Sequence, residues 1–157
     1  MPVAPFGIAA MDQLVYVAYA QRREPFTRFP VTGRGLGLVD VFTSSGVFIT
    51  RLVSGGGVLN APWSMVAVPD AHVLSRALLV GNTGDGTIDA FEPESGTWLG
   101  ALHDESGAVL VVPRLHALAF GNDSAAQPRS TLFFSAGPGQ GAQGWYGRID
   151  FDAALTR

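Results

Sequence analysis

Short apolar runs with alternating character recur along the chain and are interrupted by turn-forming residues. The runs at 14–20 and 77–82 have the length of one β-strand and are too short for a typical helix. Ser45-Gly46 and Ser95-Gly96 stand between consecutive runs, and glycine suits the tight turns that join antiparallel strands. The pattern predicts an all-β protein.

The runs repeat in units of roughly fifty residues, and each unit has the same order of strands. A first strand at 5–9 recurs at 62–66 and, more weakly, at 114–118. Each third strand carries an acid, and these acids are Asp40, Asp89 and Asp150. We expect the three aspartates to be equivalent and to accept hydrogen bonds from neighbouring turns rather than to form a ring of metal ligands.

Four short strands per unit is the pattern of a β-propeller blade. We predict about three blades, at about residues 5–53, 62–103 and 114–152, and the last blade lacks its outermost strand. Because a closed ring has about four to eight blades, three blades cannot close one. We therefore expect open surfaces on the first strand of the opening blade and at the edge after Asp150.

Composition excludes several classes of function. The chain has 47% hydrophobic and 15% charged residues, which favours a folded core, and its ten cationic residues are scattered arginines, which argues against nucleic-acid binding. No lysine or cysteine is present, so Schiff-base and thiol chemistry are excluded. No apolar window is long enough for a membrane span, and the beginning of the sequence does not have the pattern of a secretory signal.

Several segments carry a resemblance to a known family: Pro5-Phe6-Gly7-Ile8, LVYVAYA at 14–20, GLVDVF at 37–42, LNAPW at 59–63, LLVGNTGDG at 78–86 and LFFSAGP at 132–138. They resemble the C-terminal half of uncharacterised bacterial six-bladed, NHL-like propeller proteins associated with the PEP-CTERM sorting system. The resemblance implies that the chain is half of a six-bladed ring, an extracellular or periplasmic location and no particular activity. The insert at 21–35 departs from that family.

Local signatures of catalysis are missing. The sequence contains no G-x-S-x-G, H-E-x-x-H or S-x-x-K motif. The stretch 139–144 fits G-x-G-x-x-G, but a strand follows it where a dinucleotide site needs a helix, so we interpret it as a hairpin loop. We assign no catalytic residue, no metal ligand and no cofactor.

A few residues are candidates for binding a ligand or partner. His116 stands on an innermost strand, where the first two units have Gly7 and Ser64, and is the first choice for a functional site. The insert mixes arginines with aromatic residues, as protein interfaces do, and its candidates are Arg22, Arg23, Phe26, Arg28 and Phe29. Trp145 and Tyr146 follow the glycine loop and are expected to be exposed. Trp63 and Trp98 are expected in the core.

The leading hypothesis is a non-enzymatic propeller module for interaction or structure, completed by a second copy or by a partner chain. The alternative is a calcium-dependent hydrolase of the lactonase or esterase kind, with Asn82, Asp85 and His116 near the axis, because calcium prefers oxygen ligands. Asp85-Gly86 is also an ordinary hairpin turn signal.

Overall fold

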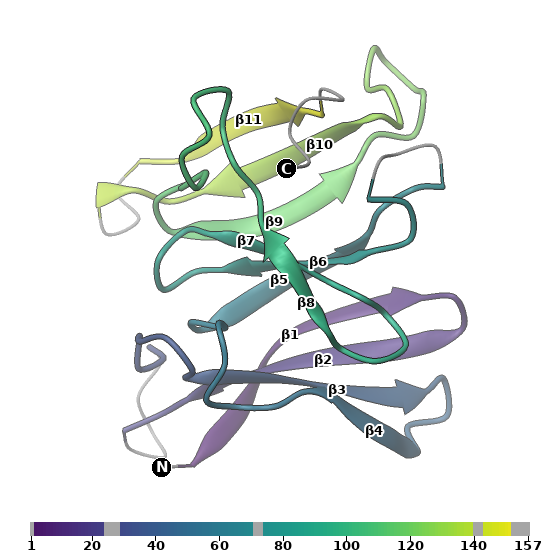
Figure 1. Ribbon diagram of the computed structural model, residues 1–157, viewed down its shortest axis with the longest axis vertical. Coiled ribbons are helices and arrows are strands. Elements are labelled where there is room, and N and C mark those ends of the chain that lie inside the picture. The colour runs from purple at the N-terminus through teal and green to yellow at the C-terminus, as the bar shows by residue number, and fades with distance from the viewer. Residues whose placement is uncertain (1, 24–28, 71–73, 140–142, 152–157) are drawn as a thin grey trace.

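The computed structural model describes residues 2–23, 29–70, 74–139 and 143–151. These residues form three antiparallel sheets and contain no α-helix, so the predicted all-β class is confirmed. The sheets follow one another along the sequence and are stacked along the long axis of the molecule, as Figure 1 shows.

Within each sheet the strands are neighbours in the order of the sequence. The first sheet contains β1 (Val3–Met11), β2 (Leu14–Gln21), β3 (Gly37–Thr43) and β4 (Phe48–Val53). The second contains β5 (Pro62–Ala67), β6 (Leu78–Asn82), β7 (Ile88–Phe91) and β8 (Trp98–Ala101). The third contains β9 (Leu115–Phe120), β10 (Thr131–Ala136) and β11 (Trp145–Asp150). The third sheet thus has three strands among the described residues.

Tight turns explain why the strands pair in this order. Asp12 and Gln13 join β1 to β2 and both have positive φ, 48° and 65°. Two consecutive positive φ values define the two-residue hairpin turn whose twist matches that of antiparallel strands. Gly46 and Gly96 have φ of 86° and 69° in the turns after β3 and β7, where the Ser-Gly pairs predict them.

The core consists of two apolar layers, one between each pair of adjacent sheets. Tyr16 and Val39 of the first sheet pack against Leu78 and Val80 of the second. Leu79, on the opposite face of the second sheet, packs with residues of the third sheet such as Leu132. The second sheet is therefore buried on both faces, whereas the first and third sheets each have one outer face without a covering sheet among the described residues.

The two tryptophans predicted in the core are not there. Trp63 is 39% exposed and Trp98 is 48% exposed. The indole of Trp98 lies over the sheet and donates a hydrogen bond from Nε1 to Asp89 at 2.8 Å. The prediction was wrong because the recurrence of an aromatic residue at a strand position does not tell on which side of the pleat the ring lies.

Candidate functional site

The first strands of the three sheets share a backbone irregularity. In β1 the pairing with β2 skips Phe6, in β5 the pairing with β6 skips Trp63, and in β9 the pairing with β10 skips His116. Such a β-bulge leaves one residue unpaired and changes the direction of its side chain. The three bulged residues are equivalent in the three sheets, and all three are ring residues.

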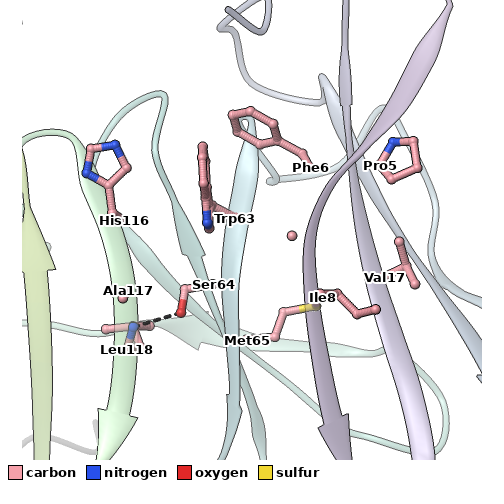
Figure 2. Close-up of a pocket in the computed structure, with 11 residues that line it drawn as sticks. Pro5, Phe6, Ile8, Val17, Trp63, Ser64, Met65, His116, Ala117 and Leu118 are labelled. Carbon is pink, nitrogen blue, oxygen red and sulfur yellow. Dashed lines mark hydrogen bonds between the residues drawn. The ribbon is translucent and has the colours of Figure 1, made fainter. Parts of the chain in front are cut away.

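The three rings form a row, which we call the ring row. Trp63 lies between Phe6 and His116 in Figure 2. Its ring centre is 4.4 Å from that of Phe6 and 5.4 Å from that of His116, with interplanar angles of 66° and 88°. These edge-to-face contacts are favourable because the positive edge of one ring meets the negative face of the other.

A groove of about 520 Å³ runs below the ring row, across β1, β5 and β9 (Figure 2). Two further sets of equivalent residues follow the ring row along the strands. The first set is small: Gly7, Ser64 and Ala117. The second set is aliphatic: Ile8, Met65 and Leu118. All of them line the groove, together with Pro5 and Val17.

Close approach of the backbones makes this arrangement possible. A Cβ on Gly7 would lie 1.7 Å from the carbonyl oxygen of Trp63, so only glycine fits between β1 and β5. Between β5 and β9, the hydroxyl of Ser64 accepts a hydrogen bond from the backbone N–H of Leu118 at 2.7 Å. The small residues therefore connect the three first strands directly.

The groove is neutral and has unused polar groups. No Asp, Glu, Lys or Arg lines it. Neither the indole N–H of Trp63 nor the imidazole of His116 hydrogen bonds to another part of the chain that the structure describes. Trp63 is 39% exposed and lines the groove. The site can thus offer hydrogen-bond donors within an apolar surface.

The sequence pattern selected His116 as a candidate residue but aligned it with the other two units one position away from its true equivalents. It was expected to match Gly7 and Ser64, whereas the register makes it equivalent to Phe6 and Trp63. Those two residues were not predicted as site residues. The signal that could have found them is the recurring Pro-aromatic pair at 5–6 and 62–63.

Asn82 is buried and Asp85 is exposed, and both belong to one hydrogen-bond network away from the groove. The side chain of Asn82 accepts from the backbone N–H of Asn60 at 2.9 Å and donates to Thr87 and Asp89 at 3.0 and 2.7 Å. Asp85 accepts from Asn60 Nδ2 at 2.8 Å and from the hydroxyl of Thr87, also at 2.8 Å. The network connects the second sheet to Gly33, whose N–H donates to Asn60 at 2.7 Å.

Of the three aspartates expected to be equivalent, only Asp40 and Asp89 are. Both pair with the same position of the second strand, and both accept hydrogen bonds from the fourth strand, from Arg51 and Trp98 respectively. Their structural role as acceptors matches the prediction, although the donors stand on strands rather than turns. The register makes Gly147 the third equivalent, three residues before Asp150. The prediction of Asp150 was wrong because residues three apart on a strand lie on opposite faces.

Asp89 is buried against the first sheet, and this raises the pKa of its carboxyl. Loss of solvent is the main cause, and the hydrogen bonds from Trp98 and Asn82 act in the opposite direction. Asp40 makes a two-bond ion pair with Arg51, at 2.7 and 3.0 Å, on the outer face of the first sheet. Its carboxylate is buried beneath the guanidinium, which is half exposed.

The calcium alternative stays a prediction. The side-chain oxygens of Asn82 and Asp85 already accept hydrogen bonds within the protein, and His116 stands at the ring row on another strand. In the described ranges no group of three His, Cys, Asp or Glu side chains is close enough to hold a metal ion. A calcium site at Asn82 and Asp85 would therefore have to share oxygens that already accept hydrogen bonds within the protein.

The remaining candidates lie in two other places. Phe26 and Arg28 are outside the described residues. Phe29 is exposed and lines a separate depression of about 560 Å³ together with Asp85 and Arg114. Arg22 and Arg23 precede it at the end of β2, where the backbone N–H of Arg22 donates to the carbonyl of Pro2 at 2.9 Å.

Trp145 and Tyr146 begin β11 and are exposed, as expected. The ring of Tyr146 stacks on Phe133 with 5.9 Å between ring centres and 10° between planes. The two residues lie on opposite faces of the third sheet, since Tyr146 pairs with Ser135 and Trp145 with Ala136. They do not belong to the groove.

Comparison with known proteins finds relatives of unknown activity. No family model matches the chain. Three uncharacterized proteins of Acanthamoeba polyphaga mimivirus are similar to it. The first is 31% identical over 156 residues, which cover 96% of this chain and 36% of the relative. Two others are 31% and 33% identical over 116 residues, which cover 73% of this chain and 22% and 30% of the relatives. The chain thus spans about a third of these proteins or less.

These relatives overturn the resemblance to the bacterial PEP-CTERM family, which was wrong. The matching proteins are viral, and no family model supports the bacterial assignment. The segments that carried the resemblance are mostly strands with their flanking turns, a pattern that any protein built from such repeated sheets shares. The expectation of an extracellular or periplasmic location depended on that family and is withdrawn with it. Within the described ranges, no helix has both the length and the apolar character of a membrane span.

Proposed function

We propose that this chain is a non-enzymatic interaction module, built as part of a β-propeller and completed by a second copy or by a partner sheet. The single observation that supports this most directly is the outer face of the first sheet, which we define by Val15, Val17, Asp40 and Phe42 with their neighbours in register. Its apolar residues stand beside the Asp40–Arg51 ion pair at positions that the second sheet buries, yet no described residue covers this face as a sheet.

The second sheet shows how the equivalent positions look when another sheet covers them. Its residues at the positions of Val15 and Phe42 are Leu78 and Phe91, and both are fully buried against the first sheet. Equivalent positions therefore form a packed layer in one sheet and an open layer in the other. Since apolar surface removed from water contributes about 25 cal/mol per Å², a covering sheet would stabilise the first sheet as the first stabilises the second.

A propeller gives this stacking a natural closure. The first strands of the three sheets are neighbours, as strands around a common axis would be (Figure 1). Three sheets are fewer than the about four to eight blades of a closed ring. The mimivirus relatives are about three times as long as the matched region or more, which leaves length for further blades in those proteins.

Measurement of molecular mass in solution tests the proposal. We expect the chain to self-associate as its concentration rises, because its apolar face is uncovered. The variant Val15→Asp places a charge in the middle of that face and should be monomeric at all concentrations. The matched control Leu99→Asp places the same charge at an exposed residue of β8 in the second sheet, outside both open end faces, and should associate like the original chain. A folded chain that is monomeric at every concentration would overturn the proposal.

A further inference from the structure

The hydrogen-bonding groups that line the groove beneath the ring row restrict which ligands can bind there. The indole N–H of Trp63 is a donor without a partner among the described residues, and the hydroxyl of Ser64 still has its own hydrogen to donate. The rest of the lining is aliphatic, aromatic or glycine, apart from His116. A matching ligand is apolar, uncharged and rich in acceptors.

Proline-rich peptides have this chemistry. Proline has no backbone N–H, so its peptide needs few acceptors from the protein. In the extended polyproline II conformation the carbonyls form no internal hydrogen bonds and are free to accept. The pyrrolidine ring is compact and apolar, and grooves lined by aromatic side chains bind such segments. The groove offers hydrogen-bond donors and aromatic rings and has no charged side chain, so it matches the chemistry of a proline-rich peptide.

The length of the ring row also fits a short polyproline II segment. The ring centres of Phe6, Trp63 and His116 follow one another at 4.4 and 5.4 Å. With a rise of about 3.1 Å per residue, about three residues of a polyproline II segment span the row. The aliphatic residues Ile8 and Met65 form the opposite side, and Ile8 is 74% exposed on its strand.

We propose that the groove across β1, β5 and β9 binds an extended, uncharged, proline-rich peptide, with Trp63 donating its indole N–H to a peptide carbonyl. Phe6 and His116 would contact the proline rings on either side. The proposal depends on the groove alone and extends the interaction module to a second kind of partner. It does not require the outer face of the first sheet to be covered, although Val17 belongs both to that face and to the groove and Ile8 pairs with it.

The test is a titration with an acetylated, amidated hexaproline peptide, followed by calorimetry and by the NMR signals of the tryptophan indole N–H groups. We expect saturable binding and a shift of one indole signal, that of Trp63. The variant Trp63→Phe keeps a ring in the row but removes the donor, and it should weaken binding about tenfold, the effect of about 1.4 kcal/mol. The matched control Trp145→Phe should bind like the original chain.

Three results would overturn the proposal: no binding at millimolar peptide, equal affinity in the Trp63→Phe variant, or equal affinity for a Gly-Ser peptide of the same length. The titration is repeated in the Val15→Asp variant. Binding there together with loss of self-association separates the groove from the outer face, so that failure of one proposal does not decide the other.

Discussion

The outer faces of the first and third sheets differ in chemistry although both lie at the ends of one stack. On the first sheet the open face has Val15 and Phe42 where the second sheet has buried Leu78 and Phe91, and its ion pair holds the Asp40 carboxylate in a buried position. On the third sheet the open face carries Arg148, at the position where the first sheet has buried Val41. The comparison indicates that the first sheet is suited to a further apolar layer and the third sheet is not.

Other residues on the outer face of the third sheet are also more polar or more exposed than their equivalents in the first sheet. Ser135 takes the place of buried Ala18, and Tyr146, at the place of buried Val39, is 70% exposed. Arg148 pairs with Asp150 at 3.0 Å on the surface. Both side chains of this ion pair are more than half exposed. Because taking an ion pair out of water costs free energy, such a face is stable in water and a poor surface for a packed sheet.

The largest expected effect on stability distinguishes Leu78 from Val15, which occupy equivalent positions in the second and first sheets. Leu78→Asp would bury a carboxylate between the first and second sheets without a partner, and we expect a loss of more than about 4 kcal/mol, enough to unfold the chain. Val15→Asp has solvent on its face and should leave the chain folded. Circular dichroism during heating measures both. Unfolding of the two variants to the same extent would mean that the outer face is already buried.

The two faces of β10 give the next largest difference. Leu132→Ala leaves a cavity in the layer between the second and third sheets and should lower the free energy of unfolding by about 2–5 kcal/mol. Phe133→Ala, one residue further along on the outer face, should lower it by less because the face is already open to water. Urea denaturation gives both values. Equal losses would contradict the assignment of the third sheet's outer face as an exposed surface.

The buried carboxyl of Asp89 predicts a pH dependence of stability. Its pKa is raised in the folded chain, because burial disfavours the charged form. The unfolded chain therefore releases this proton first, so the contribution of Asp89 to stability is fully present below the unfolded pKa of about 3.9 and falls as pH rises through the folded pKa. We expect the difference in unfolding free energy between the original chain and Asp89→Asn to change in that sense between about pH 3 and neutral pH. A difference independent of pH would show that the carboxyl is not stabilised in its protonated form.

The smallest change in stability is expected from Arg148→Val, which makes the third sheet resemble the first. Its surface ion pair contributes about 0–1 kcal/mol. The new apolar face should nevertheless produce a second mode of self-association, visible as larger species than those of the original chain. If the mass distribution does not change, the polar side chains are not what keeps the third sheet's outer face uncovered.

The groove shows most clearly where sequence reasoning reached its limit. The repeated strands were visible in the alternation of residues, and His116 was correctly placed on a first strand. Its alignment with Gly7 and Ser64 failed because a one-residue bulge has no separate signature in an apolar run. For the same reason Trp63 was assigned to the core, although it lies in the ring row.

The sequence by itself determined the all-β class, the turn positions and the order of strands within the three sheets, because turn chemistry and alternation are local properties of the chain. Only the tertiary structure decided which residues are equivalent between sheets. The pairing register shifts at the bulges, so Phe6, Trp63 and His116 meet at the groove, and Asp150 does not take the place of Asp89. Register is set by contacts between distant strands, and a shift of one residue moves a side chain to the other face.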